Sequence, residues 1–402
     1  MLSLIKNEFV KLIYKKKSIF FMIAFILLLS LIAVSEHKSS EQFKKQNTPE
    51  ARLEYLKEHK QNLVKEKNLN KEKPYIKDID KALIYIDKDI AKLEKIIASD
   101  VKEDYWRITA KESIESKKKI INEDSLSNVE KLRERKEIER LNILLEKNMP
   151  PMEMEFNSFK FIELIINDVL GYFLLAIAIV LFSSDIVSGE FTPPTLKLLM
   201  VQPVSRGKIL LSKFLTSTMC SLAFIYLIEF IFFLAIGHIF GFGNANYPVF
   251  IGTVYKLNPL ASEKSQLLME VANSTKMIPI WKNTLYILLH QGLFIIACSS
   301  FSLLVSVIFK SNIGSLIFGV FSIIVESILT SLFTPLAKLS HLLFFTYGPS
   351  SYLLNGQLAT INANPNITIG NSIICLIAWT IAWTIACYLI SYVIFTKEDI
   401  LI

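Results

Sequence analysis

The sequence predicts an all-α membrane protein with about six transmembrane helices and a large extracellular helical, coiled-coil insertion between the first and the second. Two observations carry this prediction. The 402 residues are 52% hydrophobic with a mean hydropathy of +0.41, and the apolar residues form runs long enough to cross a bilayer. The charges are concentrated instead: residues 36–160 hold 28 of the 44 lysines and arginines and 26 of the 37 acidic residues.

Residues 1–17 predict an amphipathic helix that lies in the membrane interface. Leu2, Ile5, Phe9 and Leu12 recur at helical spacing, opposite lysines, and the segment ends on three lysines at 15–17. The apolar residues 18–35 then form the first transmembrane helix. A signal peptide has a similar outline, but no small-x-small cleavage pattern follows this run. The three lysines place the N-terminus in the cytoplasm.

Residues 36–160 are expected outside the cell as a helical hairpin or three-helix bundle. A heptad seam, three and four residues apart in alternation, predicts one helix about 33 Å long. The surrounding charges fit a solvated face, so the net charge of +7 is no sign of nucleic-acid binding. The seam consists of Ile76, Ile79, Leu83, Ile86, Ile90, Leu93 and Ile97.

Residues 161–402 predict a five-helix transmembrane domain, and Lys397 places its C-terminus inside. The loops on the outer side also carry lysines, so charge bias alone does not prove this topology. The expected spans are 164–182, 210–237, 285–309, 313–333 and 372–395, with external loops at 241–281 and 334–370.

Residues 185–213 form the most informative cytoplasmic segment. Two prolines at 193–194 end any preceding helix and are suited to the first turn of a new one. The residues that follow place Leu196, Leu199 and Met200 on one helical face, with Lys197 on another. Pro203 ends that helix, and Ser205 is placed to cap the next one, which starts near Arg206.

This segment resembles the first cytoplasmic loop of ATP-binding-cassette type-2 permeases. Many of them carry a Ser-Gly-Thr-Leu-(Lys/Arg)-Leu-Leu-Leu-x-x-Pro-Val-Ser-Arg pattern, whereas here residues 190–194 separate Ser-Gly from Thr-Leu. The resemblance extends to the N-terminal helix and the closing residues 395–400, but not to residues 36–160. It implies a coupling helix that docks on a separate ATPase. The expected coupling residues are Glu190, Thr195, Leu196, Lys197, Leu199, Met200, Pro203, Ser205, Arg206 and Lys208.

The chain carries no motif for catalysis of its own. It lacks a phosphate-binding G-x-x-x-x-G-K-(S/T) loop, a G-x-S-x-G elbow and an H-E-x-x-H metal motif. Its four cysteines lie in apolar runs and imply neither a disulfide framework nor a metal cluster. We therefore expect no catalytic residue and no cofactor in this chain, with ATP and Mg²⁺ bound by the partner ATPase.

Four polar residues interrupt the predicted spans. A charged group at mid-bilayer costs about 2.5–3.5 kcal/mol on insertion scales, so each should have a partner or a wet cavity. Asp168 and Glu326 fall toward the outer headgroups, and His290 toward the interface. Glu229 lies deepest in its run and is the best candidate for a buried structural or pathway carboxylate.

The function that these observations favour is the permease subunit of an ABC exporter in the bacterial plasma membrane. Its expected partners are an ABC ATPase, a second permease copy or a paralogue, and membrane lipids, without nucleic acid. An antimicrobial peptide or another amphipathic compound would suit it as cargo. Two alternatives stay open: a membrane receptor with a coiled-coil exterior, which predicts a cytoplasmic signalling domain, and an ion-coupled secondary transporter, which predicts inverted repeats.

Overall fold

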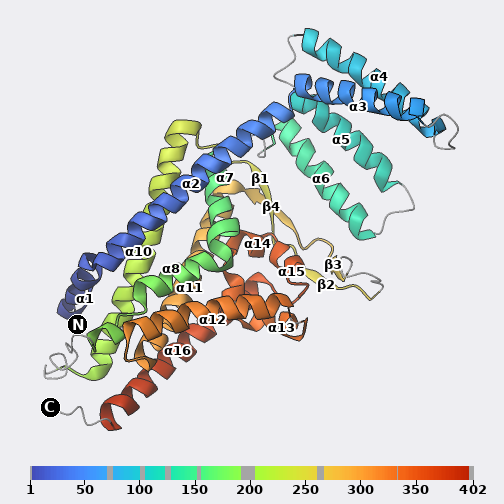
Figure 1. Ribbon diagram of the computed structural model, residues 1–402. Helices are drawn as coiled ribbons and strands as arrows, with labels where there is room; N and C mark the ends of the chain where they lie inside the picture. Colours follow the sequence, from blue (N-terminus) through green and yellow to red (C-terminus); the bar gives the residue numbers. More distant parts are fainter. Residues whose placement is uncertain are drawn as a thin grey trace. The chain divides into compact units, whose positions relative to one another are not determined.

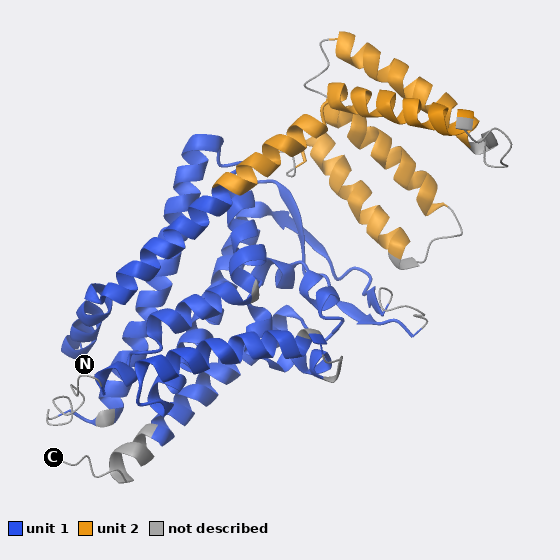
Figure 2. Cartoon of the chain, in the orientation of Figure 1, with its two compact units in different colours: residues 1–33, 157–402 blue, residues 34–156 orange. Residues whose placement is uncertain are grey.

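The computed structural model describes residues 2–69, 76–99, 105–122, 128–151, 155–191, 204–259, 267–332 and 334–397. The chain divides into two compact units (Figure 2). Unit 1 comprises residues 1–33 and 157–402, and unit 2 comprises residues 34–156.

Long apolar helices make up most of unit 1 (Figure 1). Five helices are long and apolar enough to cross a membrane, or six if one bent pair counts as a span, which agrees with the predicted helical class. The short α1 (Leu2–Tyr14) precedes them. The five are α2 (Lys16–Gln46), α10 (Arg206–Phe240), α11 (Ile280–Ile308), α12 (Asn312–Leu332) and α16 (Ile369–Lys397).

The second predicted span is bent rather than straight. It consists of α7 (Ser158–Leu164), the wide π-helical turns of η3 (Ile165–Leu174) and α8 (Leu175–Ser183), with a bend of 67°. π-Helical turns are rare and recur at functional sites. Gly171 of η3 lies so close to the 348–349 backbone that an added Cβ would come within 2.7 Å of Pro349 Cα. The absence of a side chain at Gly171 therefore allows this crossing.

Helix α11 is the centre of unit 1. It packs against α8, α10, α12 and α16. Several serines on α11 are fully buried, among them Ser302 and Ser306. Small residues let helix backbones approach closely, and their hydroxyls can bond across the interface.

The segment between α10 and α11, predicted as a loop, contains four short strands, so the chain is not entirely helical. Strand β1 (Pro248–Ile251) pairs with β4 (Lys276–Pro279), and β2 (Tyr255–Leu257) pairs with β3 (Leu268–Glu270), both antiparallel. These strands were not predicted because each pairs with a strand distant in the segment, and local sequence patterns do not show such pairing.

The segment between α12 and α16, also predicted as a loop, folds into short helical pieces. One of these, α14, packs on α11 and on η3. The pieces are α13 (Thr334–Leu339), η6 (Ser340–Leu342), η7 (Phe344–Tyr347), α14 (Ser350–Leu354) and α15 (Gln357–Ile361).

Unit 2 contains two antiparallel helix pairs, rather than one hairpin or a three-helix bundle. Helix α3 (Pro49–Leu69) pairs with α4 (Ile76–Ala98), and α5 (Tyr105–Ile121) pairs with α6 (Asn128–Glu146). The heptad seam lies on the inner face of α4: Ile86 and Leu93 pack with Leu56 of α3. A separate cluster around Ala110, Ile114 and Leu141 holds α5 on α6.

Candidate functional site

A buried lysine lies at the centre of the candidate site. Lys213, near the start of α10, has an exposed fraction of 2%. Its Nζ donates to Glu8 Oε2 at 2.9 Å, to Glu190 Oε1 at 2.6 Å and to the carbonyl oxygen of Ile186 at 3.1 Å. An ammonium group has three donors, so all of them are used. A buried charge is tolerated when it is paired and hydrogen-bonded in this way.

A second cation completes what we call the Lys213 network, which consists of Glu8, Lys11, Glu190 and Lys213. Lys11 Nζ lies 3.4 Å from Glu8 Oε1 and 3.2 Å from Glu190 Oε1, and its side chain is about half exposed. The network therefore has two positive and two negative groups. Partial burial lowers the pKa of Lys11, but the two carboxylates outweigh it and hold that pKa above its ordinary value.

Helix α1 brings two of these residues to α10, along which it packs (Figure 1). The predicted apolar face was only partly right. Leu12 is buried beside Ile186 and Val187, but Glu8 is buried as well, whereas Leu2 and Phe9 are exposed. The pairing with Lys213 turns Glu8 inward, and the exposed apolar residues fit a helix that also contacts lipid.

Serine hydroxyls fix the turn that carries Glu190. The 3₁₀ turn η4 (Ser188–Glu190) follows α8. The backbone N–H groups of Val187 and Ser188 donate to Ser306 Oγ of α11 at 2.9 and 3.1 Å. Ser315 Oγ of α12 lies 3.0 Å from Ser188 Oγ. The turn is therefore attached to α11 and α12 as well as to α1 and α10.

Just before this turn, a third buried carboxylate, that of Asp185, pairs with the basic end of the N-terminal segment. Asp185 lies 3.3 Å from Lys15 Nζ and 3.4 Å from Lys17 Nζ. Two of the three lysines from which the sequence predicts a cytoplasmic N-terminus therefore also form ion pairs. These pairs hold the start of α2 against the segment that follows α8.

Four of the ten predicted coupling residues lie within the described part of the chain. Glu190 is in the Lys213 network. Ser205 occupies the N-cap position of α10 with an extended backbone, but its side chain makes no capping hydrogen bond. Arg206 begins α10, and Lys208 is exposed. Outside the described residues lie Thr195, Leu196, Lys197, Leu199, Met200 and Pro203.

Within the described part of the chain, three of the four polar side chains in the apolar runs have a hydrogen-bond partner. Asp168, in η3, accepts a hydrogen bond from the Tyr352 hydroxyl. Glu229 Oε1 accepts from Gln291 Nε2 at 2.7 Å. His290, expected near the interface, is buried with its Nδ1 2.9 Å from Ser350 Oγ and its Nε2 3.2 Å from Ser372 Oγ.

The fourth, Glu326, lines a cavity of about 820 Å³ that Lys338 also lines. Within the described ranges, no group of three His, Cys, Asp or Glu side chains is placed to hold a metal ion.

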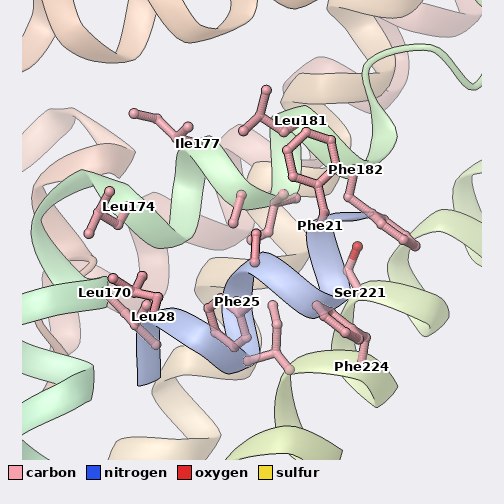
Figure 3. A pocket seen from close by; sticks show the side chains of 14 residues that line it. Phe21, Phe25, Leu28, Leu170, Leu174, Ile177, Leu181, Phe182, Ser221 and Phe224 are labelled. Atoms are coloured by element: carbon pink, nitrogen blue, oxygen red, sulfur yellow. The ribbon is translucent and has the colours of Figure 1, made fainter. Parts of the chain in front are cut away.

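A smaller cavity of about 230 Å³ lies between α2, η3, α8 and α10 (Figure 3). Phenylalanine, leucine, isoleucine and alanine side chains form its wall, and Ser221 contributes the one hydroxyl among the lining residues. Its lining holds no charged group, which distinguishes it from the cavity around Glu326.

Sequence reasoning missed Glu8, Lys11 and Lys213 as members of the site. Two signals were present. Glu8 is the one acidic residue in a basic N-terminal helix, and Glu190 adds negative charge to a basic loop. A charge that contradicts the local pattern often has a partner elsewhere in the chain, but the sequence does not name that partner.

One family model matches this chain over nearly its whole length. The model describes the ABC-2 family transporter proteins and matches residues 2–400. Neither a curated protein nor a solved structure matches the chain.

Proposed function

Since the chain belongs to the ABC-2 family of transporter proteins, and is therefore the multi-pass permease of an ABC transporter, we propose that it is the membrane subunit of an ATP-driven exporter. In this proposal the chain forms the translocation pathway. A separate ABC ATPase binds ATP and Mg²⁺ and docks on the segment 185–213. The permease works with a second copy of itself or with a paralogue.

The proposed orientation follows the lysine distribution. Both termini lie in the cytoplasm of a bacterial cell, and residues 36–160 lie outside the plasma membrane. The helical exterior is suited to an amphipathic cargo such as an antimicrobial peptide.

The observation that carries the coupling proposal is the anchoring of Glu190. Glu190 precedes the expected docking helix in the chain, and its partner Lys213 follows that helix. The Lys213 network joins both flanks of the segment to α1, and the serine contacts join the first flank to α11 and α12. Motion of a docked ATPase would therefore act on four helices through contiguous contacts.

The test replaces the apolar anchors of the expected docking helix. Changing Leu199 and Met200 together to Asp should abolish co-purification with a co-expressed ABC ATPase while membrane insertion is retained. Loss of one central anchor typically costs about 2 kcal/mol, roughly thirtyfold in affinity. Two carboxylates add a desolvation cost that an apolar cleft does not relieve.

The matched control is Lys208→Gln, at the exposed start of α10. It should mainly slow association and make it less sensitive to salt, with little loss of complex at low ionic strength. Normal partner binding and normal ATP turnover in the double Asp variant would make residues 185–213 an ordinary loop and remove the basis of the proposal.

A further inference from the structure

A lateral cavity of about 530 Å³ lies in unit 1, away from the Lys213 network. Its walls come from α7, α10 and α11. The volume is within the usual range for small-molecule sites. Most of the lining is apolar, and four side chains on its walls are largely exposed: Leu227, Phe230, Leu285 and Leu289. Because α10 and α11 are candidate membrane spans, these exposed apolar side chains would lie against hydrocarbon in a bilayer.

One carboxylate interrupts this apolar wall. Glu229 lines the cavity with an exposed fraction of 2%. Its Oε1 accepts from Gln291 Nε2, but its Oε2 has no hydrogen-bond partner among the described residues. A single amide does not offset the cost of burying a charged carboxylate, so Glu229 is held in its charged form only when a cation pairs with it.

The other polar side chains of the cavity do not supply the missing donor. The Tyr226 hydroxyl donates to the carbonyl oxygen of Leu288 at 2.6 Å, and Thr284 Oγ1 donates to the carbonyl oxygen of Ile280 at 3.0 Å. The Tyr226 hydroxyl is also held close to Gly292, where an added Cβ would come within 2.5 Å of its oxygen. Both donors are therefore committed to backbone groups, and Glu229 Oε2 is left without a donor from the described residues.

We propose that this cavity binds a hydrophobic amine, whose ammonium group pairs with Glu229 and whose apolar body fills the space between α7, α10 and α11. An acyl chain alone would cover the apolar wall but leave the carboxylate without a counter-charge. A hydrophobic amine covers the apolar wall and also supplies the counter-charge. The site rests on the cavity and on Glu229, and it does not require the docking of an ATPase proposed above.

The test measures saturable binding of tritiated decylamine to the purified full-length chain in phosphatidylcholine nanodiscs. Decanol, which has the same chain length without the charge, serves as competitor. The wild type should bind decylamine saturably, and decanol should compete at least tenfold less well than unlabelled decylamine. Glu229→Gln should weaken decylamine binding at least tenfold and remove the preference for the amine.

Two further variants separate charge from volume. Leu288→Trp fills this cavity and should weaken both ligands. Ala178→Leu narrows the 230 Å³ cavity instead and should leave decylamine binding unchanged. If Glu229→Gln does not fold, the proposal is still tested by the preference of the wild type for the amine and by the weaker decylamine binding of Leu288→Trp.

Three results would overturn the proposal. The first is no saturable binding to the wild type. The second is equal competition by decanol, which identifies a plain site for hydrocarbon chains. The third is decylamine binding that neither Glu229→Gln nor Leu288→Trp reduces.

Discussion

The two units of this chain form ion pairs of similar length in different surroundings. In unit 2, Lys57 Nζ lies 2.8 Å from Glu94 Oε1, and both side chains are about half exposed. In unit 1, Lys213 lies 2.9 Å from Glu8, and the lysine is almost completely buried. Water competes for the first pair and is excluded from the second. Burial, rather than distance, therefore decides what the loss of one partner costs.

The largest expected effect is the removal of the buried cation. Lys213→Met should destabilise the protein by about 3–5 kcal/mol, because it leaves Glu8 and Glu190 with only the half-exposed Lys11. Thermal unfolding of the purified full-length chain measures this. The exposed Lys208→Met is the matched control and should change stability by at most about 0.5 kcal/mol.

A triple variant tests whether the unpaired charge is the cause. Adding Glu8→Gln and Glu190→Gln to Lys213→Met removes the stranded carboxylates and should recover most of the lost stability. A triple variant no more stable than Lys213→Met would mean that the lysine acts through packing, and the contrast between the two units would not be one of charge burial.

The second effect concerns the apolar seam of unit 2, which holds α3 and α4 together where ion pairs are weak. Ile86→Ala should cost about 2 kcal/mol or more, because Ile86 is buried against Leu56 and Leu93. Faster amide hydrogen exchange over α3 and α4 reports this local loss. Ile84, with an exposed fraction of 57%, is the control, and an equal acceleration in Ile84→Ala would contradict the assignment of the buried face.

Some features of the two units could be predicted from the sequence, and others could not. Apolar runs in the one unit and heptad spacing in the other are local patterns, so the candidate spans and the buried face of α4 could be read from them. The bend at η3 could not, because its π-helical turns accommodate the close crossing of Gly171 with the 348–349 backbone, a contact between residues distant in sequence. The short strands escaped prediction for the same reason.

The candidate site was predicted least well where its contacts are least local. Glu190 was recognised because it contradicts the basic character of its loop. Its partner Lys213 looked like one more cation of that loop, and Glu8 is 205 positions away from it. Spacing rules act over a helical turn or a strand, and they do not identify a pair formed between α1 and α10.

The smallest effect should come from an exposed pair of unit 2, and it sets the lower limit of the comparison. Lys60 Nζ lies 2.5 Å from Asp87 Oδ1, but both side chains are more than 40% exposed. A double-mutant cycle with Lys60→Ala and Asp87→Ala should give a coupling free energy of about 0.2–1 kcal/mol, since solvent screens the charges and ordering two side chains costs entropy. Raising the ionic strength to about 1 M should shrink this coupling, because the screening length falls to about 3 Å.

The same cycle on Lys213 and Glu8 should give a larger coupling free energy that salt hardly changes. Equal coupling energies with equal salt dependence would show that burial does not separate the two units, and the description of Lys213 and Glu8 as a pair shielded from water would be wrong.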